Sequence, residues 1–255
     1  MEKEPLVSII TPLYNSEKFI AETIESVLAQ TYTNWEMIIV NDCSKDNGSK
    51  IVKEYVEKDK RIKLFNNEKN LGGAGTRNKA IKEAKGRYLA FLDSDDNWTP
   101  LKLEKQISFM EKNNFFFTFT EYEKIDEESK SLNEKVIVPE KVTYKKLLKA
   151  NVIGCLTAVY NQEKLGKIYM PDIRKGQDFA LWLEVLKVSK EGYGLFETLG
   201  KYRIRQNSLS QNKWDRIKCN YLIFRKYNNL GVIQSSWYVI NNILEKVLKL
   251  RIIKL

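Results

Sequence analysis

Short apolar runs alternate with amphipathic segments along the first part of the chain. Apolar runs of this length, rich in β-branched residues, are typical of buried strands. They are Leu6–Thr11, Glu36–Asn41, Ile62–Asn66 and Tyr88–Leu92. The segments with helical periodicity are Glu17–Gln30, Asp46–Lys58, Ala74–Lys85 and Leu101–Lys112. Because strand and helix alternate, the pattern predicts an α/β fold of Rossmann type, with a mostly parallel sheet covered by helices on both faces.

Two helix starts carry recognisable signals. Ser16 precedes the first helical segment and is predicted to cap it, and Thr99 followed by Pro100 is typical of the start of a helix.

Beyond residue 113 the pattern is looser. We expect strands at Phe115–Thr120 and Cys155–Tyr160, a charged loop at Asp126–Lys135 and a helix at Gln177–Val188. From Lys213 the chain is predicted to be helical, with a break near Asn228–Gly231. We therefore expect one domain over residues 1–205 and a basic helical extension over residues 206–255.

Polar groups follow the predicted parallel strands. In sheets of this kind, ligands bind at the carboxyl ends of the strands, where loops lead into helix N-termini. These ends read Thr11–Asn15, Asn41–Ser44, Asn70–Asn78 and Asp93–Asp96. Three of the four carry groups suited to a nucleotide and a metal ion.

The cluster Asp93, Asp95 and Asp96 directly follows the apolar run Tyr88–Leu92. Carboxylates a few ångströms apart raise one another's pKa, and a divalent cation with oxygen ligands relieves that repulsion. Mg²⁺ or Mn²⁺ bound here would bridge a pyrophosphate. The alternative is a solvated acidic turn that caps the next helix.

Two further positions are candidates for chemistry. The run Gly72–Gly75 precedes a helix without matching a dinucleotide-binding or P-loop motif, so Arg77, whose guanidinium can face a diphosphate, is the more specific signal. Asp178 follows Gly176 and Gln177 at the start of a predicted helix, where capping is the simpler interpretation. The chain has no histidine, so Asp178 becomes the leading candidate for a general base.

Composition narrows the functional classes. The absence of histidine excludes histidine-based catalysis and histidine metal ligation, and the 3 cysteines show neither metal-site spacing nor a disulfide framework.

The net charge of +10 lies in residues 201–255, which hold 12 Lys and Arg against 2 Asp and Glu. Such segregation indicates a phosphate-rich partner, either nucleic acid or an anionic membrane. The N-terminus does not resemble a secretory signal, so we expect a cytoplasmic protein.

Taken together, the motifs resemble the bacterial family 2 inverting glycosyltransferases of GT-A fold. The resemblance covers about residues 5–205, and the joint order and spacing of the motifs are more specific than any one of them. It implies transfer from a nucleoside-diphosphate sugar, a UDP-sugar foremost, to a hydroxyl of a saccharide or lipid-linked acceptor in bacterial surface polysaccharide synthesis. The alternative is a sugar-phosphate nucleotidyltransferase, although the loop after the first strand, Pro12–Asn15, lacks the usual glycines and basic residue. A non-enzymatic nucleic-acid or membrane adaptor built on the basic tail ranks last, because it leaves the acidic sites at the strand ends unexplained.

The resemblance also implies roles for individual residues. Asp178 is the catalytic base, and Asp95 binds Mn²⁺ or Mg²⁺. Nucleotide contacts are implied for Thr11, Pro12, Tyr14, Asp42, Arg77, Asp93 and Ser94. Contacts with the donor sugar or diphosphate are implied for Gly73, Asp96 and Arg205, and contacts on the acceptor side for Gln177 and Trp182. The chain departs from the family pattern in having Gln177 where Glu is common, and Tyr202–Ser208 where a histidine is common. We infer that Arg205 replaces that histidine.

The C-terminal segment 232–255 has the pattern of an amphipathic basic helix. Its apolar positions are Ile233, Trp237, Ile240, Leu244, Val247 and Leu248, interspersed with Lys246, Lys249, Arg251 and Lys254. It either packs on the core, contacts another subunit, or anchors the protein peripherally to the inner face of the plasma membrane. The sequence leaves the oligomeric state open.

Overall fold

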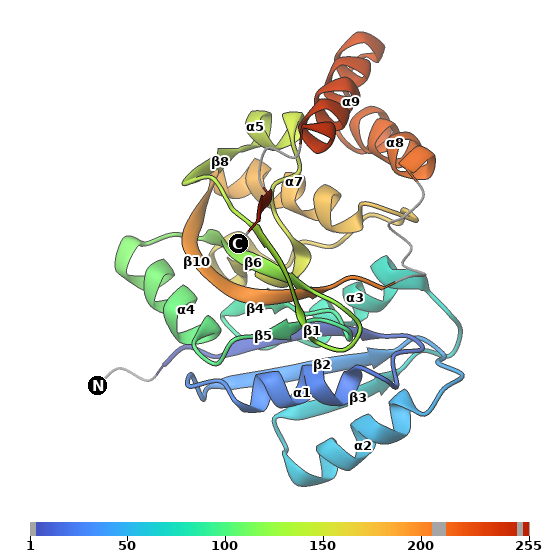
Figure 1. The fold of residues 1–255 in the computed structure, drawn as a ribbon, viewed down its shortest axis with the longest axis vertical. Coiled ribbons are helices and arrows are strands. Elements are labelled where there is room, and N and C mark those ends of the chain that lie inside the picture. Colours follow the sequence, from blue (N-terminus) through green and yellow to red (C-terminus); the bar gives the residue numbers. More distant parts are fainter. Residues whose placement is uncertain (1–3, 206–212, 249–251, 255) are drawn as a thin grey trace.

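Four parallel strands form the centre of the fold. The computed structural model describes residues 4–205, 213–248 and 252–254. Strands β1 (Val7–Leu13), β2 (Trp35–Asn41), β3 (Ile62–Asn66) and β4 (Tyr88–Phe91) pair in parallel in the order β3-β2-β1-β4. Every residue of β2 is buried, as expected for a strand covered on both faces. The predicted parallel sheet is therefore confirmed (Figure 1).

The first three helices connect these strands, and the fourth comes after β4 along the chain. They are α1 (Ile20–Leu28), α2 (Gly48–Lys58), α3 (Gly72–Glu83) and α4 (Lys102–Asn113). The predicted cap at Ser16 is wrong, because α1 begins after Phe19 and has no side-chain cap. The Ser16 hydroxyl instead donates to the Tyr14 carbonyl (3.2 Å) and accepts from Ser94 (3.0 Å), tying the loop after β1 to the loop after β4.

An antiparallel region extends the sheet beyond β4. Strands β9 (Val159–Asn161), β6 (Phe117–Ile125), β7 (Ser131–Val136) and β11 (Ile252–Lys254) follow in that order. Of the segment predicted as a charged loop, Asp126–Lys135, the first half is a turn as expected and the second half, from Ser131, is strand. Its charges face one another across the ladder, as in the pair Lys124–Glu134 at 2.6 Å, so the strand is stabilised without an apolar pattern.

A long strand, β10 (Glu191–Arg203), runs parallel to β6 and pairs with the short strands β5 (Asn97–Trp98) and β8 (Lys141–Thr143). The end of β10 lies beside the acidic turn that follows β4. The short helices of this half are α5 (Tyr144–Lys149) and α6 (Gln162–Leu165). The expected strand Cys155–Tyr160 begins instead with a 3₁₀ turn, Cys155–Thr157.

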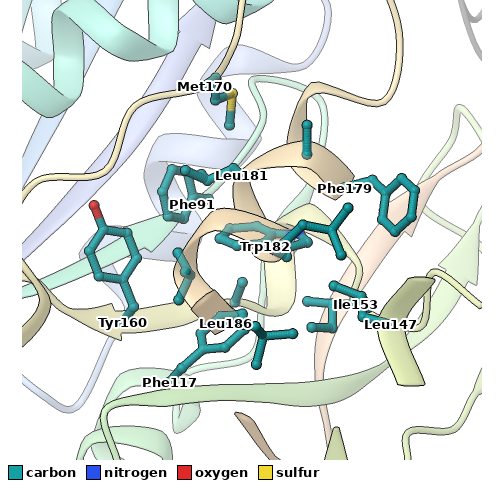
Figure 2. Packing of buried hydrophobic residues seen from close by; sticks show 14 of the residues in the cluster. Phe91, Phe117, Leu147, Ile153, Tyr160, Met170, Phe179, Leu181, Trp182 and Leu186 are labelled. Carbon is teal, nitrogen blue, oxygen red and sulfur yellow. The ribbon is translucent and has the colours of Figure 1, made fainter. Parts of the chain in front are cut away.

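Helix α7 (Gln177–Ser189) packs on the sheet through a large aromatic cluster (Figure 2). Trp182 lies in its centre, with its ring 5.1 Å from that of Phe91 and 5.5 Å from that of Phe117. Its exposed fraction is 0%. The prediction that Trp182 contacts the acceptor is therefore wrong, because the side chain points from α7 into the core.

The C-terminal segment consists of α8 (Lys213–Leu222), a π-helical segment (Ile223–Tyr227) and α9 (Val232–Val247). The predicted break between helices is confirmed. The segment is not purely helical, since β11 adds a strand to β7. Within the described part of the chain, no helix is both long enough and apolar enough to cross a membrane.

Candidate active site

The carboxylate of Asp42, just after β2, organises the start of α3. It accepts hydrogen bonds from the backbone N–H groups of Leu71 (2.8 Å) and Gly72 (2.9 Å) and from the side chain of Asn67 (2.8 Å). Gly72 has φ +69°, a left-handed conformation that favours glycine. Asp42 is 3% exposed, so its observed function is to shape the glycine-rich loop, and its contact with a nucleotide stays a prediction.

Arg77 joins three elements of the site. Its guanidinium forms an ion pair with Asp93 after β4 and donates to the side-chain oxygen of Gln177 on α7 (3.3 Å) and to the carbonyl of Gly73 (3.3 Å). A Cβ atom at Gly73 would lie 2.8 Å from the Gln177 oxygen and 2.9 Å from the guanidinium. Glycine at position 73 therefore allows α3 and α7 to approach closely.

The three carboxylates of the acidic turn do not converge. Asp93 pairs with Arg77, Asp95 with Arg205 (3.0 Å), and Asp96 accepts the backbone N–H of Arg203 (2.9 Å). Among the described residues, no group of three or more Cys, Asp or Glu side chains is arranged to hold a metal ion. The described residues of this turn therefore form no shared three-carboxylate cage, and Asp95 as the single predicted protein ligand stays a prediction.

A metal ion nevertheless fits beside Asp95. Burial, and next the charge of Asp93, raise the pKa of Asp95, while Arg205 opposes the rise. Mg²⁺ and Mn²⁺ are commonly held by one or two carboxylates together with substrate phosphates. Asp95, with Asp93 beside it, matches that donor set. Asp96 is 2% exposed, and burial followed by the charge of Asp95 raises its pKa well above the usual value, so it is a buried support of the turn rather than a sugar contact.

Arg203, which the sequence reasoning missed, clamps this turn from the end of β10. Its guanidinium is 0% exposed; it donates to the carbonyl of Asp95 (2.8 Å) and pairs with Glu22 on α1 (2.6 Å). The guanidinium also donates to the carbonyls of Asp126 and Glu127. Its only signal in the sequence was its place in the stretch where relatives have a histidine. Positions 206–208 of that stretch lie outside the described residues.

Replacing Arg203 with alanine should destabilise the protein by about 3 kcal/mol or more, because a buried charge network loses its centre. Chemical denaturation measures the change in the free energy of unfolding. Lys201→Ala is the matched control on the same strand, since its pair with Glu123 (3.5 Å) is partly exposed to solvent and is worth less than about 1 kcal/mol. Equal losses in the two variants would contradict the clamp.

Asp178 lies in the first turn of α7, after Gly176 with φ +74°. Burial raises the pKa of its carboxyl, opposed by a hydrogen bond from the Phe179 backbone and by the charge of Arg77. Cys155 lies in the same region, and burial raises the pKa of its thiol well above the usual value. A protonated thiol is a poor base and nucleophile, so the carboxylate is the better base.

The loop before α7 is fixed by Asn78, another residue that the sequence reasoning did not single out. Its amide donates to the Met170 carbonyl and accepts from the Met170 backbone N–H, each at 2.8 Å. Because Asn78 follows Arg77 on α3, one helix carries both the ion-pair partner of Asp93 and the residue that fixes the loop leading to Asp178.

The end of β1 supplies the remaining predicted nucleotide contacts. Tyr14 is 48% exposed and Pro12 partly so, but Thr11 is fully buried, so its hydroxyl does not reach a ligand in this structure. Ser94 is likewise buried and bonded to Ser16. A polar cavity of about 230 Å³ lies beside this loop, lined by Asn15, Glu17, Lys18, Phe19, Asp46, Glu127 and Arg205.

These features match a known enzyme family. A model described as Glycosyl transferase family 2 matches residues 8–231. The chain belongs to glycosyl transferase family 2. The family confirms the resemblance seen in the sequence and leaves the nucleotidyltransferase alternative without support.

Curated members of family 2 are similar to this chain over most of their length. TuaG of Bacillus subtilis, whose name assigns it to teichuronic acid biosynthesis, is 44% identical over 92% of this chain and 93% of its own. The UDP-Glc:alpha-D-GlcNAc-diphosphoundecaprenol beta-1,3-glucosyltransferase WfgD of Escherichia coli is 47% identical over 84% of this chain and 83% of its own.

Solved structures confirm the GT-A fold of this family 2 chain. S. aureus TarS 1-349 in complex with UDP-GlcNAc aligns with a TM-score of 0.73 at 21% identity, over 96% of this chain and 73% of that chain. The mannosyltransferase PcManGT from Pyrobaculum calidifontis, in complex with GDP-Man and Mn²⁺, aligns with a TM-score of 0.70 at 15% identity, over 93% and 70%.

Proposed function

We propose that this glycosyltransferase moves glucose from UDP-glucose to a sugar hydroxyl of a lipid-diphosphate-linked saccharide. Support for the donor comes from the names of WfgD and of WfaP, the latter 39% identical over 83% of this chain, both of which are UDP-Glc glucosyltransferases acting on GlcNAc-diphosphoundecaprenol. Support for a role in polymer synthesis comes from the name of TuaG, which assigns that protein to teichuronic acid biosynthesis. The product would be a surface polysaccharide or its lipid-linked precursor.

The observation that supports this reaction type is a chain of contacts. Asp178 is next to Gln177 in the chain, Gln177 is hydrogen-bonded to Arg77, and Arg77 is ion-paired with Asp93. The donor-side ion pair and the candidate base are tied together by the Arg77–Gln177 hydrogen bond of 3.3 Å. Asp178 accepts the proton of the attacking hydroxyl, which then displaces the nucleoside diphosphate at the anomeric carbon in one step. A single displacement inverts the anomeric configuration.

The donor half of the site consists of the loop after β1, the loop that begins α3, and the acidic turn. Tyr14 is exposed at this edge and Arg205 lines the adjoining cavity, so both are available to a nucleotide and its diphosphate. Asp95, with Asp93 beside it, would hold Mn²⁺ or Mg²⁺, which when bound neutralises charge on the diphosphate leaving group. We propose that Arg205, now paired with Asp95, turns to the diphosphate as a further cation.

A donor and acceptor panel tests the function. The protein is incubated with Mn²⁺, GlcNAc-diphosphoprenol and UDP-glucose, UDP-galactose, UDP-GlcNAc or GDP-mannose, and release of nucleoside diphosphate is followed. We expect the fastest acceptor-dependent release with UDP-glucose. Preference for GDP-mannose, or release that the acceptor does not increase with any donor, would contradict the proposal.

The acid limb of the pH profile should reflect Asp178. A base acts in its ionised form, and burial raises the pKa of Asp178 above the ordinary value of 3.8. Lowering the pH through that raised pKa therefore removes activity at a higher pH than an exposed aspartate would. We expect kcat/KM to fall on the acid side with a midpoint above 3.8, at pH values where UDP binding, measured in parallel, is unchanged. A midpoint at or below 3.8 would argue against Asp178 as the base.

A further inference from the structure

Helix α9 is packed with its apolar stripe outward. The residues that face the protein are Ser235, Val239 and Asn242, at helical spacing, and Asn242 donates to the carbonyl of Leu148 (2.8 Å). The opposite face carries Ile233 (86% exposed), Trp237 (46%), Ile240 (55%) and Leu244 (52%), and Leu248 (62%) follows directly after the helix. A helix that packs on a core normally buries its apolar stripe. Of the three interpretations of this segment, packing of the apolar stripe on the core does not match the structure.

The apolar surface continues from α9 onto α8. A cavity of about 500 Å³ separates the two helices and is lined almost entirely by apolar atoms, from Ile217, Tyr221, Leu222, Val239 and Ile240 among others. Leu222 is itself 49% exposed. Contiguous apolar patches of this kind on a protein surface mark sites of interaction with membranes or other proteins. We call this surface, formed by the outward stripe of α9 and by Leu222, the apolar face.

Basic side chains border the apolar face. Exposed lysines and arginines lie on the neighbouring elements, at Lys145, Lys146, Lys149, Lys218, Arg225 and Lys226. The Lys149 ammonium lies 5.4 Å from the centre of the Trp237 ring. In Figure 1, α5, the helix that carries Lys149, lies next to α9. Lys249 and Arg251 lie outside the described residues, and the side chains of Lys246, Val247 and Lys254 are not described.

We propose that the apolar face docks on an anionic lipid bilayer, with α9 lying in the plane of the interface. An apolar stripe with a tryptophan, flanked by cations, matches the chemistry of a bilayer, in which acyl chains lie beneath negative headgroups. Charge complementarity favours lipid over a second copy of the chain, because a two-fold contact would bring each basic border against its own copy.

Docking there would place the acceptor end of the active site near the membrane. The Tyr227 hydroxyl donates to the carbonyl of Asp172 (3.1 Å), and Lys175 pairs with Asp215 on α8 (3.3 Å). The C-terminal helices therefore hold the loop that leads to Asp178. Only this placement rests on the proposed function, since the apolar face itself is independent of it.

Vesicle flotation tests the proposal without donor or acceptor. The wild type should float with phosphatidylglycerol vesicles and much less with phosphatidylcholine vesicles. The double variant Ile240→Glu with Leu244→Glu should lose about tenfold or more of the binding, because two apolar side chains that would enter the bilayer are replaced by charges that the anionic headgroups repel. The control Lys50→Gln with Lys53→Gln makes the same net charge change on α2, at the other end of the molecule, and should bind like the wild type.

A second variant, Lys145→Gln with Lys149→Gln, keeps the stripe and should lower phosphatidylglycerol binding severalfold. Circular dichroism checks that each variant is folded. The stripe variant should keep wild-type transfer to a water-soluble acceptor analogue, which separates docking from catalysis. A wild type that binds no vesicle overturns the proposal, as does a folded stripe variant that binds them fully. The face would be assigned to self-association instead if the wild type binds no vesicles and is a dimer in sedimentation velocity, while the stripe variant is a monomer.

Discussion

Asp178→Asn is expected to lower the rate of glycosyl transfer by a factor on the order of 10³ while leaving the affinity for UDP-glucose unchanged. The amide keeps the size and the helix position of the side chain but has no basicity, so the attacking hydroxyl keeps its proton. Because burial raises the pKa of Asp178, the carboxylate is costly in the folded state, and the amide should not reduce stability. Steady-state kinetics and calorimetric titration of UDP measure the two quantities.

Asp172→Asn is the matched control for this prediction. Asp172 lies on the loop before α7 and its side chain is exposed. We expect the control to transfer glucose at close to the wild-type rate. An Asp178→Asn variant that retains more than about a tenth of wild-type kcat, or one that also loses UDP binding, would show that Asp178 is not the base.

Asp95→Ala should lower the affinity for UDP by about 100-fold and abolish its dependence on Mn²⁺. Asp95 is the carboxylate that best fits a cation shared with the diphosphate. Asp96 is buried under the Arg203 clamp, and Asp93 is paired with Arg77, which is only 12% exposed, whereas Arg205, the partner of Asp95, is 34% exposed and lines the open cavity. Loss of a cation that bridges protein and diphosphate costs several kcal/mol of binding, hence the size of the effect. Titration of UDP with Mn²⁺ and with EDTA measures it.

The control Glu128→Ala removes an exposed carboxylate from the nearby turn after β6. Its UDP affinity should match that of the wild type with either Mn²⁺ or EDTA. If Asp95→Ala binds UDP as the wild type does and still responds to Mn²⁺, the cation is held elsewhere. If EDTA leaves wild-type binding unchanged, no metal is needed for the donor.

The parallel half of the fold was predictable because burial on both faces leaves continuous apolar runs, as in β2. The antiparallel half was harder. Strand β7 is held by backbone pairing and by cross-strand charge pairs such as Lys124–Glu134, and neither produces an apolar pattern. The outward stripe of α9 was visible as periodicity, but periodicity alone does not say which face meets the protein.

In the candidate site, too, some features were predictable from the sequence and others were not. The motifs located Asp93, Asp178 and Arg77 because residues at strand and helix ends are fixed by topology, and the structure links Arg77 to Asp93 and to Gln177. Side-chain direction was not predictable. Trp182 follows Asp178 by one helical turn yet points into the core, and Asp95 and Asp96 diverge because Arg203, distant in sequence, reaches the turn through β10.

The stereochemistry of the product tests the central claim most directly. With UDP-glucose, whose anomeric bond is α, one displacement assisted by Asp178 must give a β-linked glucose. The product formed on GlcNAc-diphosphoprenol can be analysed by proton NMR, where the coupling at the anomeric proton distinguishes the two linkages. We predict a β-glucosyl product. An α-linked product would mean retention, and it would contradict a single displacement with Asp178 as its base.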